Sequence, residues 1–169
     1  MSSKSKHGSK SKTRKSAGTT KHIQAGLPII FAMTTEQASR LKRIANDSLD
    51  RFREGKAVGI DFTNIHQRLV TGHHLCVDIL HLEGDDASVF MPISEALIIN
   101  HAIKDRAFEN TKVNWHATPV EIEIIDEALD IIDQLQDQVS RRDLQTAFRQ
   151  AQVSVKTALN KGRKEMSKT

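Results

Sequence analysis

The chain has 169 residues, enough for one ordinary domain with terminal extensions, and a net charge of +4. It contains no tyrosine, one tryptophan and six phenylalanines, so its core must be built mainly from Leu, Ile, Val and Ala, which favours packed helices over a β-sandwich. The only cysteine, Cys76, excludes an intramolecular disulfide, and no apolar run approaches the roughly 18 residues that a membrane span needs.

The charge is distributed unevenly along the chain. Residues 1–24 carry +7 without a single acid, residues 25–139 carry −9, and residues 140–169 carry +6. This layout predicts a disordered basic tail at 1–24, a helical domain at 25–160 and a basic C-terminal tail at 161–169. The N-terminus lacks the apolar stretch of a secretory signal, so we expect a cytoplasmic protein with no membrane partner.

The basic ends have two interpretations that the sequence leaves open. In one, they bind DNA or RNA by neutralising phosphates. The residues that would do so are Lys4, Lys6, Lys10, Lys12, Arg14, Lys15, Lys21, Arg163 and Lys164. In the other, the N-terminal tail is only solvated, or it folds back on the acidic body. Because the body would repel phosphates, any nucleic-acid contact should be confined to the ends.

Order is expected to begin at residues 25–33, where Pro28 favours extended geometry and an apolar arm or edge strand follows. The first helix should span residues 35–54. Thr34 and Gln37 have the spacing of a capping box, apolar residues recur at helical intervals, and Gly55 provides a stop. Its opposite side should carry a basic strip of Arg40, Lys42, Arg43, Arg51 and Arg53.

Two more helices are predicted in the middle of the chain. One should span about residues 62–82, capped by Asp61, with Gly72 allowing another helix to approach closely at a cost of about 1 kcal/mol relative to alanine. The next should run from residue 93 to about residue 110. For its start, either Pro92 occupies the first turn, or a turn from Asp86 to Met91 runs into Pro92 with a kink.

The fourth and fifth helices have the clearest start signals. Thr118-Pro119-Val120-Glu121 combines an N-cap, a proline and a capping-box glutamate, and Ser140 starts a last helix that Gly162 should end near residue 160. The short loop between them predicts a tight helical hairpin. We therefore expect an all-α fold, an antiparallel bundle of four or five helices.

One face of the fourth helix is almost purely acidic: Glu123, Asp126, Glu127, Asp130, Asp133 and Asp137. Acid–base catalysis would require these carboxylates to lie in a desolvated cleft, whereas a solvated face suits docking of a basic partner. No phosphate-binding loop, nucleophile elbow, zinc ribbon, EF-hand or helix-turn-helix pattern is present. We therefore expect no enzyme activity, and a protein-binding face at Glu123, Asp126, Glu127, Asp130 and Asp133.

Histidines are enriched in residues 62–82. His74, Asp78 and His81 would share one face of a regular helix, and Asp78 to His81 has the carboxylate-x-x-His spacing of di-iron bundles. The sequence names no further ligands, so a solvated face is the expected alternative and we expect no cofactor. A role in pH sensing stays open. Cys76 is predicted to be a small buried hydrophobe and not a nucleophile.

Three features resemble small helical proteins encoded by proteobacterial phages and plasmids. They are the Lys/Arg-rich start before Leu27-Pro28-Ile29-Ile30, the Thr-Pro-x-Glu start of the fourth helix, and the Ser140-Arg141-Arg142-Asp143-Leu144 start of the fifth. The resemblance implies an accessory protein of a mobile element acting inside a bacterial cell. It assigns no functional residue.

These observations together predict a non-enzymatic binding or regulatory protein. Its acidic face would bind a host or mobile-element protein, and its basic tails would contact nucleic acid. Two alternatives stay open: an inhibitor whose acidic face mimics a polyanion and blocks a host or defence protein, and a metal-binding helical bundle. A homodimer also stays open, with apolar surface at residues 29–31 available for it.

Overall fold

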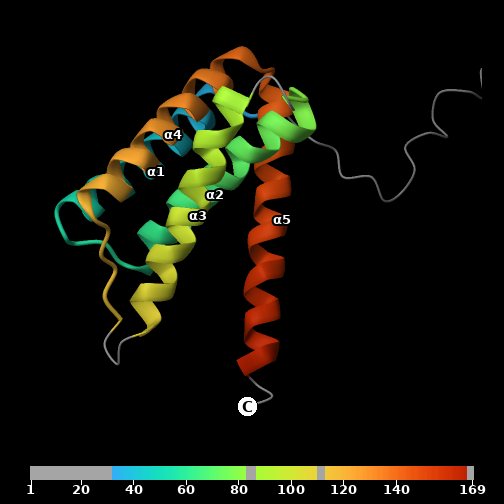
Figure 1. Ribbon diagram of the computed structural model, residues 1–169. Helices are drawn as coiled ribbons and strands as arrows, with labels where there is room; N and C mark the ends of the chain where they lie inside the picture. Colours follow the sequence, from blue (N-terminus) through green and yellow to red (C-terminus); the bar gives the residue numbers. More distant parts are fainter. Residues whose placement is uncertain (1–31, 83–86, 110–112, 167–169) are drawn as a thin grey trace, which may run out of the picture.

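The computed structural model describes residues 32–82, 87–109 and 113–166, with the side chains of Ala87 and of residues 158–166 left undescribed. It is an all-α bundle, as predicted (Figure 1). The elements are α1 (Thr35–Arg53), α2 (Gly59–His74), the π-helix η1 (Leu75–Ile79), α3 (Ala87–Glu109), α4 (Pro119–Gln138) and α5 (Arg141–Met166). These described segments include no strand, and none of their helices combines the length and apolar character that crossing a bilayer requires.

The central helix of the bundle is α2, which contacts α1, α3, α4 and α5 (Figure 1). Its Ile65 and Leu69 are completely buried. Gly72 lies against α4 so closely that an added Cβ atom would sit 2.3 Å from Cγ1 of Ile132. The close helix approach predicted at this glycine is therefore confirmed. Because four helices contact α2, some of its polar residues lie in the interior.

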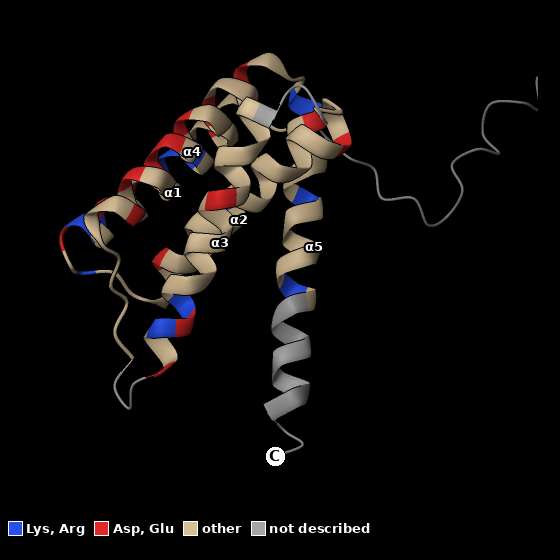
Figure 2. Cartoon of the chain, in the orientation of Figure 1, with Lys and Arg blue, Asp and Glu red and all other residues tan. Residues whose placement is uncertain are grey.

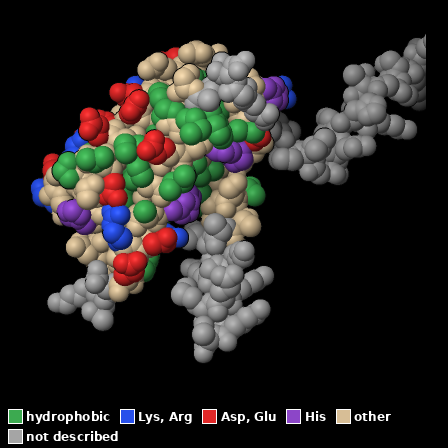
Figure 3. All heavy atoms as spheres, viewed as in Figure 1, with side chains coloured by type: hydrophobic (Ala, Val, Ile, Leu, Met, Phe, Trp, Pro, Cys, Tyr) green, Lys and Arg blue, Asp and Glu red, His purple; other side chains and the backbone are tan. Residues whose placement is uncertain are grey.

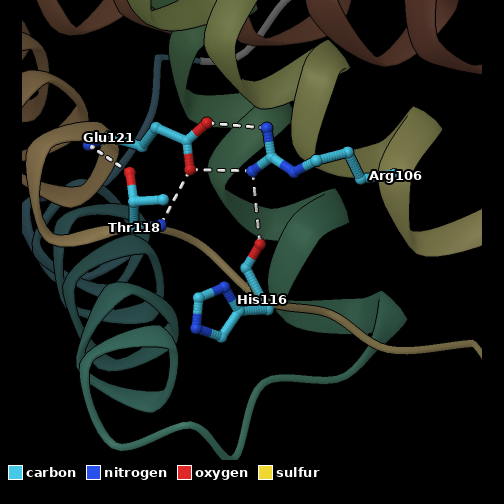
Figure 4. A network of polar contacts seen from close by, with 4 residues as sticks. All are labelled: Arg106, His116, Thr118 and Glu121. Atoms are coloured by element: carbon cyan, nitrogen blue, oxygen red, sulfur yellow. Dashed lines mark hydrogen bonds and ion pairs between the residues drawn. The ribbon is translucent and has the colours of Figure 1, made fainter.

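The two predicted capping boxes are present. At α1, the backbone N–H of Gln37 donates to Oγ1 of Thr34, and the backbone N–H of Thr34 donates to Oε1 of Gln37. At α4, Thr118 and Glu121 exchange the same pair of hydrogen bonds. Arg106 of α3 donates hydrogen bonds to both carboxylate oxygens of Glu121 and to the backbone carbonyl of His116 (Figure 4). Burial raises the pKa of Glu121, but the bonds from Arg106 and Thr118 outweigh it and leave the pKa lowered. This network joins α3 to the start of α4.

The second predicted helix differs from expectation at both ends. It begins at Gly59, and Asp61 caps it from inside the first turn by accepting a bond from the Val58 amide. It changes at Leu75 to a π-helix, whose wider turns are closed by bonds such as Leu80 N–H to the Leu75 carbonyl. The backbone then leaves the helix at His81, which has a φ of 52°. The helical segment therefore ends at Ile79, three residues before the approximate end predicted at residue 82.

Neither alternative for the start of α3 was right. The helix begins at Ala87, and Pro92 lies inside it. Proline in the second turn removes only the bond that would reach the carbonyl of Ser88. Because Ser88 is exposed, water can satisfy that carbonyl. The proline therefore does not set the helix start.

The predicted α4–α5 hairpin was also wrong. α5 packs against α2 and η1 and diverges from α3 towards its C-terminal end (Figure 1). α4 packs instead against α1, α2 and α3. α5 also continues through Gly162 to Met166, so much of the tail predicted at 161–169 has helical backbone. One glycine costs about 1 kcal/mol and does not by itself end a helix.

Candidate functional site

The solvent-facing side of α4 carries a row of acidic residues (Figure 2). We name this row the acidic stripe; it consists of Glu123, Glu127, Asp130 and Asp137. All four are exposed, and none forms an ion pair with another residue that the structure describes. Their spacing places them on one helix face over about 21 Å, at 1.5 Å per residue. The stripe therefore presents four carboxylates on one exposed face of α4.

Two other predicted members of this face have different environments. Asp126 is paired with Arg53 of α1, whose Nη2 lies 2.5 Å from Oδ2. Asp133 is only 7 % exposed, so its predicted position on the solvent-facing side was wrong. Asp133 directly follows the buried Ile132 and turns towards α1 and α2, where two cations meet it.

Asp133 pairs with one buried cation, Arg68, and one half-exposed cation, Lys42. Nη2 of Arg68 donates to Oδ1 at 2.7 Å, and Nζ of Lys42 lies 2.7 Å from Oδ2. Burial lowers the pKa of Arg68, and the bond to Asp133 opposes that effect. The same carboxylate raises the pKa of Lys42, chiefly through its hydrogen bond. Sequence analysis missed Arg68, although it is the only lysine or arginine between Lys56 and Lys104.

The candidate metal ligands do not converge. Nδ1 of His74 lies 2.6 Å from Oδ2 of Asp78, but His81 lies beyond the π-helix with its Nδ1 3.1 Å from the Val77 carbonyl. The change from α- to π-helix breaks the spacing that would have aligned them. In the described parts of the chain, no group of three or more His, Cys, Asp or Glu side chains is arranged to hold a metal ion.

Four histidines instead line one groove of about 380 Å³ between α2, α3 and α5: His66, His73, His74 and His101. His101 comes from α3, so helix-by-helix sequence analysis did not associate it with the others. The ring of His66 stacks on Phe62 and meets His101 edge-on at 4.9 Å between centroids. Burial, with smaller contributions from the charges of His101 and Lys104, lowers the pKa of His66 to about 4. Burial likewise lowers the pKa values of His73 and His101.

These shifts predict loss of stability in mild acid. A histidine whose pKa falls from 6.5 to about 4 on folding binds its proton more tightly in the unfolded chain. The stability that the neutral His66 contributes to the folded state is therefore complete above pH 6.5. It is lost as the pH falls towards 4. From pH 7 to pH 5, His66 should account for about 1 kcal/mol of lost unfolding free energy, since partial exposure weakens the effect.

Urea denaturation at both pH values checks this expectation. His66→Phe should reduce the difference between the two free energies, whereas His116→Gln, at an exposed site, should not. An unchanged pH difference in His66→Phe would contradict the assignment.

Cys76 is completely buried, as predicted. Burial raises the pKa of its thiol to about 11, so almost none of it is thiolate at neutral pH. Cys76 therefore packs as a small apolar side chain.

Hydrophobic side chains gather across the face seen in Figure 3, with histidines beside them. On α3, Met91 and Ile98 are 59 % and 70 % exposed and are seven residues apart on one helix face. The residues proposed for homodimer contact, 29–31, lie outside the described part of the chain. The side chains assigned to nucleic-acid binding in both basic ends also lie outside it; Arg163 and Lys164 have described backbone within α5.

Comparison with known proteins identifies no relative. No protein-family model matches the chain, and no curated protein or solved structure is significantly similar to it.

Proposed function

We propose that this chain is a non-enzymatic binding protein of a mobile genetic element, in which the acidic stripe docks a basic protein partner and the basic ends contact nucleic acid. The observation that carries the proposal is the alignment of four exposed carboxylates on α4 that have no ion-pair partner in the described chain. Their neighbours Asp126 and Asp133 are used internally, so the stripe is what remains for another molecule.

The charge distribution supports a division of labour between the stripe and the ends. Complementary charge across an interface mainly accelerates encounter and excludes like-charged partners. A basic protein would approach α4, and a polyanion would approach the +7 of residues 1–24. The resemblance to phage and plasmid proteins supports a role in a mobile element. The inhibitor alternative uses the same stripe, with the partner's nucleic-acid site as the docked surface.

A pull-down from bacterial lysate, with and without nuclease, tests the proposal. Full-length protein is compared with a stripe variant, Glu123→Gln/Glu127→Gln/Asp130→Asn/Asp137→Asn, and with a chain lacking residues 1–24. A partner bound by the stripe should survive nuclease and be lost from the stripe variant. Material held through nucleic acid should disappear with nuclease or with the tail.

A second fourfold variant controls for net charge. Glu36→Gln/Asp47→Asn/Glu95→Gln/Glu109→Gln changes the charge by the same amount at exposed acids outside the stripe. It should retain the nuclease-resistant partner. Equal loss from both fourfold variants would show that net charge and not the stripe governs binding, and capture unaffected by any of the changes would overturn the proposal.

A further inference from the structure

The chain enters the described structure beside the start of α5. The backbone N–H of Met33 donates to the Arg141 carbonyl at 3.2 Å, and the Met33 side chain is only 5 % exposed. Its neighbours Ala32 and Thr34 are exposed, and Thr34 has extended backbone with a ψ of 158°. Successive side chains of an extended chain point to opposite sides. Residues 32–34 show this alternation, with Met33 turned towards the bundle.

The sequence directly before residue 32 continues the alternation with apolar residues. We name residues 27–31, Leu-Pro-Ile-Ile-Phe, the apolar segment; they lie outside the described part of the chain. Phe31 and Ile29 precede Met33 by two and four residues, so in an extended chain they share its side. Burial of large apolar side chains drives folding, so this segment favours an apolar surface within its reach.

A cavity of about 150 Å³ lies between α1 and α5, which both pack on α2. Its floor on α2 is polar, but its side walls are apolar: Leu41 and Ile44 from α1 and Phe148 from α5, all three only partly buried. An engineered apolar cavity of similar volume in another protein holds benzene. The cavity therefore has room for one large apolar side chain.

The apolar segment has the right length to reach this cavity. Leu41 lies six residues into α1 and Phe148 seven residues into α5, so each is about 10 Å from the start of its helix, near Met33. An extended chain advances about 3.3 Å per residue, which brings Phe31 about 7 Å and Ile29 about 13 Å from Met33. These two distances bracket the walls of the cavity.

Two other surfaces suit the segment less well. The histidine-lined groove includes α5 only at Ser154 and Val155, and Ser154 is thirteen residues, or about 20 Å, from Arg141. That distance is beyond the reach of Ile29. The solvent-facing side of α4 carries the acidic stripe, whose carboxylates offer no apolar contact.

We propose that the apolar segment docks in extended conformation in the cavity between α1 and α5 of its own chain, with Ile29 and Phe31 against the apolar walls. Pro28 supports this geometry because it disfavours helical backbone at the preceding residue. Docking fixes the point at which the basic residues 1–24 leave the bundle. The cavity is lined by α1, α2 and α5, so docking is independent of the acidic stripe and of the proposed function.

NMR spectroscopy of the full-length chain with labelled methyl groups tests the contact directly. We expect nuclear Overhauser effects between the methyl groups of Ile29 and those of Leu41 and Ile44. In a mixture of labelled and unlabelled chains, these effects should arise within one chain. Three results would overturn the proposal: effects between chains, which would make the segment a link between two copies; effects to Val70 or Leu97, which line the histidine groove; or no effects from Ile29 to any helix.

Two neighbouring substitutions give a matched comparison of stability. Ile29→Asp places a charge on the side of the segment that faces the cavity, so it should lower the melting temperature by at least about 4 °C. Ile30→Asp makes the same chemical change on the opposite side and should lower it by less than about 1 °C. Equal melting temperatures for the two variants would contradict docking in this register.

Discussion

Replacing Asp133 with asparagine should reduce the free energy of unfolding by about 3–5 kcal/mol. The change leaves the Arg68 guanidinium, 3 % exposed, without the carboxylate that now lies 2.7 Å away. A buried charge without a partner is strongly destabilising, whereas Lys42 is half exposed and can turn to water. Urea denaturation followed by circular dichroism gives the measurement.

Asp130→Asn is the matched control for this prediction. It makes the same chemical change one turn earlier on α4, at an exposed site, and should alter stability by less than about 0.5 kcal/mol. Arg68→Met/Asp133→Leu should be much more stable than Asp133→Asn alone, because it removes both charges. If the two single asparagine variants were equally stable, Asp133 would have to be solvated and its pair with Arg68 would not be buried.

Gly72→Ala should destabilise the protein by about 1–2 kcal/mol although alanine is the better helix former. Helix propensity favours alanine by about 1 kcal/mol, but the new Cβ would lie 2.3 Å and 2.5 Å from two carbons of the buried Ile132. Forcing a methyl group into a close-packed core typically costs about 1–3 kcal/mol, and more where the neighbour cannot move. Thermal and urea unfolding measure the difference.

A double-mutant cycle separates the steric clash from other effects. Ile132→Ala should destabilise the protein alone, but the double variant should be less destabilised than the sum of the single changes, by at least about 1 kcal/mol. Gly59→Ala provides the control, because its Cβ would meet Trp115 at an ordinary contact distance of 3.4 Å. Strict additivity at Gly72 and Ile132 would contradict the close packing of α2 on α4.

Local sequence patterns predicted the helices well and the contacts between helices poorly. The capping boxes at Thr34 and Thr118 depend on residues three apart, so they can be read directly from the chain. The start of α3 and the end of α2 could not be read in this way. Pro92 is tolerated because one lost bond falls near solvent, and the helix before His81 is widened by a π-turn that no spacing rule indicates.

The candidate site shows the same limitation. Glu123, Glu127 and Asp130 are exposed as the helical pattern of α4 implies. Asp133 was assigned to the same face, but its partner Arg68 is 65 residues away in the sequence and its environment is set by packing. The isolation of Arg68 among uncharged neighbours on α2 was the available signal. As the only lysine or arginine of α2, Arg68 needs a counterion if it is buried, and only the tertiary structure shows its burial and its partner Asp133.

The central position of α2 has a consequence for how the chain folds. A helix that contacts four others cannot bury its apolar residues by pairing with the next segment alone; it needs α4 and α5 from the far half of the chain. Two contacts join residues at least sixty positions apart: the packing of Gly72 on Ile132 and the hydrogen bond from Arg68 to Asp133. Neither half can form a complete core by itself, so we expect the described helices α1 to α5 to fold in a single cooperative step.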